Sequence, residues 1–440
     1  MNWFQRSNAF YLLSFFIIII SIGTLLLMLP GVWCGEGSLS FTDAVFTASS
    51  AVCVAGLAVV NTSGFSRFGH IVILFLIQTG GLGIISFSSI LLTIPGNRLA
   101  MIQQTTIQSF YIDGIEYRPR IIVRNIMVFT ACIEAGGAIL LALLFRVEGV
   151  RDWLFMGIFH AVSAFCNTGI SLFENGLTSF NREVLLMLII ILLIALGGLG
   201  FIVIQELLGL ARGRLTHLSY HSRVVLGMSA LLVFGGTILF YILERGRSFG
   251  AMGTGTAVVN ALFQSVNTRS GGFDLISQRA LSQPSKLLTC LLMLVGGAPG
   301  SIAGGIKITI VFVILVLIFR KPDSHGDINV FHHRLSGESI HRAVVYTLKA
   351  LALLLLCIGA LTVFEGLDGQ SMGSLVFEVF SAFATVGLSL GATGSLSEGG
   401  KWVIIIAMFA GRVGLVALAF PALRQNKYDI SYPEGTLLLE

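Results

Sequence analysis

The chain has 440 residues, of which 55% are hydrophobic and only 11% are charged, with a formal net charge of +5. An ordinary soluble domain carries roughly a quarter charged residues, so this composition indicates a polytopic membrane protein. The positive charge is not clustered into the basic face that nucleic-acid binding needs. No partner nucleic acid is therefore expected.

Glycine is abundant in this chain, with 51 residues, whereas proline occurs only 8 times. In a membrane, this much glycine predicts close helix packing and broken helices. The six cysteines show no C-x-x-C spacing and most lie within apolar runs, which favours buried free thiols over zinc or disulfides.

Eight long apolar segments are each near or above the roughly 20 residues that a spanning helix needs. The first follows Arg6, is too long for the core of a signal peptide and lacks a small-x-small cleavage site. Four shorter pieces lie between the members of successive pairs, and their length is that of re-entrant pore helices. The eight spans are predicted at 9–30, 69–95, 122–146, 183–210, 222–244, 285–319, 343–364 and 400–422, and the short pieces at 41–57, 152–170, 256–273 and 372–388.

The order of span, short helix, glycine loop and span recurs four times. The key glycines of the loops, Gly56, Gly169, Gly272 and Gly387, are spaced almost evenly along the chain. We therefore predict an all-α polytopic membrane protein in which four span–pore helix–span repeats, with eight transmembrane helices and four re-entrant pore loops, surround a central pore. The predicted repeats are 1–95, 96–212, 213–320 with a broken second span, and 321–440 with a cytoplasmic C-terminal tail.

Lys and Arg indicate the orientation of the chain. With eight spans, both termini share one side with the loops at 96–121, 211–221 and 320–342, and that side carries more basic residues than the side of the glycine loops. The positive-inside rule places the termini in the cytoplasm and the glycine loops outside.

The glycine loops have the chemistry of an ion filter. Each short helix points its partially negative C-terminus at the centre, which favours a cation. Glycine allows the sharp turn that follows, and backbone carbonyls can replace the hydration shell of the ion. No loop contributes a carboxylate before its glycine, so a monovalent ion, potassium, is favoured over a divalent one. The alternative is that each glycine only lets helices cross. The candidate ion-binding residues are Val52, Cys53, Val54, Ala55, Gly56, Cys166, Asn167, Thr168, Gly169, Thr268, Arg269, Ser270, Gly271, Gly272, Ala384, Thr385, Val386 and Gly387.

The sixth span is interrupted by a run of glycines with a proline, which cannot stay helical cheaply. Irregular backbone at membrane depth survives only against protein or a watery cavity, so this segment is a candidate gate below the filter. A simple packing kink is the alternative. The candidate gating residues are Gly296, Gly297, Ala298, Pro299, Gly300, Ser301, Ile302, Ala303, Gly304, Gly305, Lys307 and Arg412.

Arg269, Lys307, Lys349 and Arg412 fall within loops or spans, and three of them are considered for a role at the pore. Arg412 lies mid-span and should face the interior, where it either lines the pore beside residues 296–305 or pairs with a carboxylate. Lys307 is similar but can extend towards the cytoplasm. Arg269, inside the third loop, is expected to brace the filter from behind. Two further motifs, 78–83 and 195–200, place small residues in equivalent spans and predict close helix packing.

Several motifs stand at matching places from the first span to the last. They are Ser50-Ala51-Val52-Cys53-Val54 with Gly56-Leu57, residues 159–167, residues 300–307, residues 380–391 and Gly411-Arg412-Val413-Gly414. Together these motifs resemble the Trk/Ktr/HKT superfamily of potassium transporters. The chain resembles the Ktr-type membrane subunit in having eight spans without extra N-terminal helices.

This resemblance implies potassium uptake, often stimulated by sodium, through a filter with one glycine per repeat and metal coordination by backbone carbonyls. It implies a homodimer in the cell (inner) membrane on a cytoplasmic ring of regulatory subunits that bind the nucleotide, with no cofactor on this chain. The broken span then matches an intramembrane gating loop and Arg412 the arginine that contacts it. Ala55, where threonine is common, and Leu415, where proline often stands, depart from the pattern.

Two other classes of function stay open on the sequence. A coupled secondary transporter for another monovalent cation would need an intramembrane carboxylate, and Glu134, Glu206 and Glu378 are the candidates. A membrane-embedded enzyme would need a reactive cluster, for which the chain offers His325, His332, His333 and His341. These histidines lie in a charged loop without a nucleophile or ligand spacing, which favours a solvated face or a docking surface.

Overall fold

The computed structural model describes residues 3–35, 37–93, 119–321, 328–331, 333–366 and 371–419. Helices form nearly all of the regular structure in these ranges, as predicted. A small departure is the antiparallel pair β1 (Asn329–Val330) and β2 (His333–Arg334). The predicted boundary at 95/96, the tail beyond residue 419, His325, His332 and the side chain of Leu415 lie outside what the structure describes.

The helices follow one another in four groups of a long helix, a short helix and a second long element. The first group is α1 (Trp3–Leu27), α2 (Phe41–Val52) and α3 (Arg67–Thr93), and the second is α5 (Pro119–Val147), α6 (Trp153–Phe165) and α7 (Val184–Leu199) with α8 (Phe201–Ala211). The third is α9 (Tyr220–Glu244), α10 (Thr254–Asn267) and α11 (Gln283–Leu294) with α12 (Ile308–Phe319), and the fourth is α13 (Gly337–Glu365), α14 (Met372–Ala384) and α15 (Glu398–Ala419).

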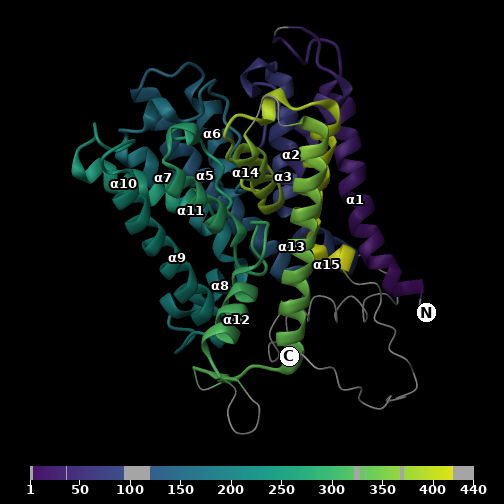
Figure 1. Ribbon diagram of the computed structural model, residues 1–440, viewed down its shortest axis with the longest axis vertical. Coiled ribbons are helices and arrows are strands. Elements are labelled where there is room, and N and C mark those ends of the chain that lie inside the picture. The colour runs from purple at the N-terminus through teal and green to yellow at the C-terminus, as the bar shows by residue number, and fades with distance from the viewer. Residues whose placement is uncertain are drawn as a thin grey trace.

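The four groups pack in a closed circle. Within each group the short helix packs against a long helix of its own group, and between groups α3 meets α6, α7 meets α10, α11 meets α14 and α15 meets α2. Figure 1 shows α2, α6, α10 and α14 in the same half of the molecule, with α8 and α12 in the other half. The short helices therefore converge at one level of the fold.

Serine caps fix the start of two short helices. The Ser40 side chain accepts a hydrogen bond from the Asp43 amide at the start of α2, and Ser371 accepts one from Ser374 at the start of α14. Such caps satisfy amides that have no partner within the helix. The position of these short helices is thus set locally at one end, and by the loop that follows at the other.

The outside of the helix bundle is apolar. Large side chains such as Ile18 on α1, Leu231 and Phe234 on α9, and Leu355 and Val363 on α13 are more than half exposed. An exposed apolar face of this extent suits the hydrocarbon of a bilayer, where helices satisfy their own backbone groups.

The structure accounts for part of the predicted spans by length and composition. Within its described residues, Arg124–Val147, Tyr220–Glu244 and Gly337–Glu365 are each long and apolar enough to cross a membrane, and α7 with α8 passes as a fourth, bent span. The remaining four predicted spans coincide with α1, α3, α11 with α12, and α15. Their crossing stays a prediction.

One predicted span differs from the structure. Residues 183–210 are expected as one continuous helix, but α7 and α8 meet at an angle of 106° at Gly200. Gly200 has φ +84°, which glycine adopts without the penalty of a side chain. Two spans are therefore broken, not one, and the second break lies beside the first.

Candidate functional site: a ring of four glycine loops

Each short helix is followed by a turn of the same form. A non-glycine residue takes a left-handed conformation, and two residues later a glycine has positive φ. The pairs are Val54 (57°) with Gly56 (75°), Asn167 (56°) with Gly169 (73°), Ser270 (78°) with Gly272 (76°), and Thr385 (50°) with Gly387 (97°). Four loops far apart in sequence thus share one backbone path.

The four glycines bring these loops into contact, and we call Gly56, Gly169, Gly272 and Gly387 the glycine ring. A Cβ atom on Gly56 would lie 2.1 Å from the Thr168 carbonyl oxygen and 3.0 Å from Cα of Gly387. One on Gly169 would lie 2.4 Å from Cα of Gly272, and one on Gly272 would lie 2.1 Å from the Val386 oxygen. Each loop therefore touches the next, and no side chain fits at these positions.

Hydrogen bonds to the short helices orient the loop backbone. The amides of Ala55, Thr168 and Val386 donate to the carbonyls five residues earlier, at 2.8, 2.8 and 2.9 Å. Because these amides bond back to the helices, the carbonyl oxygens are the backbone groups left at the ring. The oxygens of Ala55, Thr168 and Val386 each lie beside a ring glycine.

Counted from the end of its short helix to its ring glycine, the third loop is one residue longer than the first two, and a side chain helps to fix it. The Asn267 side chain accepts from the Phe273 amide at 2.9 Å and donates to the Phe273 carbonyl at 2.7 Å. This clamp spans Thr268 to Gly272 and holds Gly272 in the ring. The buried Nε of Arg269 has no hydrogen-bond partner among the described residues, and its bracing of the filter stays a prediction.

Hydroxyl groups collect beside the ring without partners. The buried side-chain oxygens of Thr168, Ser270 and Thr385, one in each of three loops, accept and donate no hydrogen bond within the described part of the chain. Buried polar groups usually find a partner, so these three hydroxyls of the ring loops are exceptions to the general pattern.

The interrupted span forms an irregular loop directly beside the ring. Its ends are joined by the Gly296 amide, which donates to the Ile306 carbonyl at 2.9 Å. A Cβ atom on Gly304 would lie 2.2 Å from the Thr385 hydroxyl oxygen. The Lys307 ammonium donates to the Ala303 carbonyl at 2.6 Å, so Lys307 bonds within this loop.

The same loop is joined to the break between α7 and α8. The Ala298 amide donates to the Gly198 carbonyl at 3.0 Å, and the Ile302 amide donates to the Gly197 carbonyl at 3.2 Å. In a continuous helix these two carbonyls would accept from residues four positions later. The loop therefore supplies the partners that the break at Gly200 removes.

Arg412 connects three elements. Its guanidinium, on α15, donates to the carbonyl of Ile302 in the loop and to those of Gly80 and Gly81 on α3, the latter two at 2.6 and 3.3 Å. The residue is only 5% exposed, and among the described residues it forms no ion pair. The sequence left two alternatives for Arg412, a place beside residues 296–305 or a pair with a carboxylate. The structure places it beside residues 296–305.

Glycines in the second long helices let the short helices approach. A Cβ on Gly80 would lie 2.0 Å from the Val52 carbonyl oxygen, and one on Gly197 would lie 2.0 Å from that of Phe165. The packing predicted for 78–83 and 195–200 is thus present. Gly411 on α15 packs in the same way against α14, because a Cβ on Gly411 would lie 1.8 Å from the Phe383 carbonyl oxygen. Sequence reasoning missed this equivalence.

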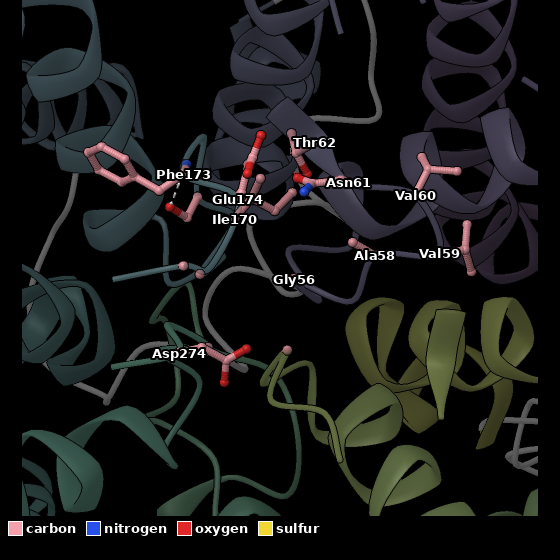
Figure 2. A pocket seen from close by; sticks show the side chains of 15 residues that line it. Gly56, Ala58, Val59, Val60, Asn61, Thr62, Ile170, Phe173, Glu174 and Asp274 are labelled. Carbon is pink, nitrogen blue, oxygen red and sulfur yellow. Dashed lines mark hydrogen bonds between the residues drawn. The ribbon is translucent and has the colours of Figure 1, made fainter. Parts of the chain in front are cut away.

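On the side of the residues that follow the ring glycines lies a cavity of about 290 Å³. All four ring glycines line it, together with the carboxylates of Glu174 and Asp274 (Figure 2). Asp274 is half-buried, and burial, followed by the nearby Glu378 carboxylate, raises its pKa to about 7. Neither Glu174 nor Asp274 was singled out from the sequence, because each stands outside any motif.

The carboxylates considered for coupled transport have structural partners. Glu378 accepts hydrogen bonds from the Leu390 amide and the Ser389 hydroxyl, which fixes the segment after the fourth loop. Glu134 accepts from Gln78 at 3.0 Å, and Glu206 accepts from the Ser219 amide at 2.9 Å. None of the three is contributed by the ring loops.

Comparison with known proteins places nearly the whole chain in one family. The family model of TrkH, described as a cation transport protein, matches residues 5–428. The Ktr system potassium uptake protein B of Vibrio alginolyticus is 34% identical over 91% of this chain and 88% of its own length. The potassium/sodium uptake protein NtpJ of Enterococcus hirae is 34% identical over 96% of this chain and 95% of its own.

A solved structure shares the fold. The potassium transporter TrkH from Vibrio parahaemolyticus superposes with a TM-score of 0.74 over 94% of this chain and 84% of that one, at 19% identity. The protein is accordingly a multi-pass membrane protein and a transporter, not an enzyme. Its chain belongs to the TrkH family of cation transport proteins, as a membrane subunit of the Trk/Ktr type.

Proposed function

We propose that this protein takes up potassium across the cell membrane through the glycine ring. The observation that carries the proposal is the closed contact of four loops whose carbonyl oxygens lie at the ring and whose filter positions include no carboxylate. Neutral oxygens of this kind suit a dehydrated monovalent cation. Relatives named as potassium uptake proteins agree with this choice of ion.

We further propose that the loop at 296–305 is the gate. It packs beside the fourth filter loop through Gly304 and Thr385, and Arg412 bonds to its Ile302 carbonyl. In this arrangement a movement of the loop changes access to the ring from the cytoplasmic side.

We also propose that two copies of the chain assemble on a cytoplasmic ring of nucleotide-binding regulatory subunits, with both termini in the cytoplasm. The relatives named as parts of a Ktr system support a membrane subunit that works with another component. We also propose sodium as an activator; one relative is named a potassium/sodium uptake protein, so sodium as well as potassium is part of its printed function.

Replacement of Gly387 by serine tests the filter. A side chain there would lie 2.9 Å from the Ala55 carbonyl oxygen, and φ of +97° is strained for serine, so the loop must shift. We expect the preference for potassium over sodium to fall about tenfold or more, a loss of about 1.4 kcal/mol. Rubidium and sodium uptake by cells that lack their own potassium uptake systems would measure it.

The matched control for this experiment is Gly136→Ala, a glycine on α5 with open space around it. It should transport as the wild type does. If Gly387→Ser still takes up potassium with unchanged selectivity, the glycine ring is not the selectivity filter. Uptake in strict proportion to a proton or sodium gradient would instead favour a coupled secondary transporter.

A further inference from the structure

The cavity over the glycine ring has one sign of charge. Among the residues that line it, Glu174 and Asp274 are acidic and none is Lys, Arg or His. The four ring glycines are its floor, so any ion that reaches the ring from this side passes these carboxylates. A cleft lined by one sign of charge raises the local concentration of the opposite ion.

Asp274 is held close to the ring by backbone contacts. It follows Gly272 by two residues, and its carbonyl accepts a hydrogen bond from the Leu177 amide at 2.8 Å. A Cβ on Gly176 would lie 3.0 Å from the Asp274 Cβ, so the segment after the second loop packs directly on this residue. The backbone of Asp274, from which the carboxylate extends, is therefore held between two neighbouring loops.

The Asp274 carboxylate also has an oxygen without a hydrogen-bond donor in the described part of the chain. Its Oδ1 is buried and has no hydrogen-bond partner within the described residues. The nearby Glu378 differs, because amides and hydroxyls of 389–393 satisfy its oxygens. A buried carboxylate oxygen without a donor is costly, and the positive charge of a cation in the adjoining cavity would offset part of that cost without touching this oxygen.

We propose that Asp274 makes this cavity a recruiting site for a hydrated monovalent cation, which waits there before it sheds water in the ring. Figure 2 shows Asp274 and Glu174 on different loops bordering the same cavity. Asp274 is the dominant group because it is fixed and half-buried, whereas Glu174 is exposed to solvent. This assignment rests on the proposed function, and it predicts that charge at position 274 sets KM for the ion.

The test uses Asp274→Cys with Cys34 and Cys132, the exposed native thiols, replaced by serine. The purified full-length protein is placed in liposomes, and rubidium uptake is measured before and after a negatively charged sulfonatoethyl or a positively charged trimethylammonium-ethyl thiosulfonate. We expect KM to rise about 3- to 10-fold in the cysteine variant. The sulfonate should return KM towards the wild-type value, the ammonium group should raise it further, and the potassium/sodium preference should not change.

Asp152→Cys is the control, because Asp152 is an exposed carboxylate outside the cavity and lies 3.6 Å from Arg67. Neither reagent should change the KM of this control variant for rubidium. If Asp274→Cys does not insert into liposomes, Asp274→Asn and Asp274→Glu give the same comparison, with only the glutamate keeping a low KM. Equal effects of both reagents, or an unchanged KM, would overturn the recruiting role, whereas a wild type without rubidium uptake would contradict the proposed function itself.

Discussion

At the scale of single residues, glycine has two separate tasks in this protein. The ring glycines take positive φ and leave no room for a side chain. The second group is Gly80, Gly197 and Gly411, which are helical. Each lacks a side chain where a carbonyl near the C-terminus of a short helix packs against it. The first group shapes the proposed filter, and the second sets how closely the helices support it.

Gly80→Ala tests the supporting role. The new methyl group would lie 2.0 Å from the Val52 carbonyl oxygen, which is backbone and cannot turn aside. Overpacking of this kind costs about 1–3 kcal/mol, so we expect a lower midpoint of thermal unfolding in detergent. Gly136→Ala, with open space around it, should unfold as the wild type does, and equal midpoints would contradict the packing interpretation.

A pH dependence follows from Asp274. Its pKa is raised to about 7, so the carboxyl group progressively gains a proton and loses its charge as the pH falls through this region. The groups that face it are themselves acidic, Glu378 on α14 and Glu174 across the cavity. We expect KM for rubidium to rise as the outside pH falls from 8 to 6. Asp274→Asn should show the high KM throughout, and an equally steep pH profile in this variant would assign the effect to another group.

At the scale of elements, the two broken helices satisfy each other's backbone hydrogen bonds. The loop between α11 and α12 donates its amides to carbonyls at the end of α7, and the Phe201 amide at the start of α8 donates to the Gly300 carbonyl at 3.4 Å. Irregular backbone inside a membrane protein is tolerated where neighbouring backbone satisfies it. The two breaks share these hydrogen bonds, so we expect movement of one segment to disturb the other.

Gly200→Ala tests this coupling. Alanine disfavours φ of +84° and favours a continuous helix, which would return the Gly197 and Gly198 carbonyls to partners within that helix. The loop at 296–305 would then lose two hydrogen bonds. We expect rubidium flux without any regulatory partner to rise at least several-fold in liposomes. Gly227→Ala, at an open position on α9, is the control, and equal fluxes would show that the break does not restrain the loop.

At the scale of the whole molecule, one chain closes the circle by itself. The last group meets the first where α15 packs on α2, and Gly387 meets Gly56. A complete ring within one chain means that assembly is not needed to form the proposed path. Any second copy or regulatory partner would then act on gating rather than on ion choice.

The proposed assembly can be measured directly. We expect the purified protein to have twice the mass of one chain by light scattering with the detergent contribution subtracted, and to retain a nucleotide-binding partner on coexpression. Exchange of the bound nucleotide should change rubidium flux but leave the potassium/sodium preference within about twofold, because the filter is complete in each chain. A monomer that transports with normal regulation would contradict the dimer.

Local sequence was sufficient for the elements that depend on local chemistry. Apolar length located the long helices, and the glycines that require positive φ located all four loops. The run from Gly296 to Gly305 was correctly assigned as non-helical, because its glycines and proline disfavour a helix whatever lies nearby. The break at Gly200 was missed, since Gly197, Gly198 and Gly200 are equally compatible with a tightly packed helix.

Contacts between distant segments decided the rest. Whether Gly200 bends the chain depends on amides from residues 298 and 302, about a hundred positions away, and the partners of Arg412 are carbonyls that any sequence would offer. Backbone groups carry no sequence signature, so such partners cannot be read from residue types. The negative charge of the cavity could not be read from the sequence either, because Glu174 and Asp274 become neighbours of the ring only when the second and third loops meet. The sequence by itself determined a membrane protein with four glycine loops and one broken span, and the tertiary structure alone decided how these loops close, what holds the broken backbone and where charge collects.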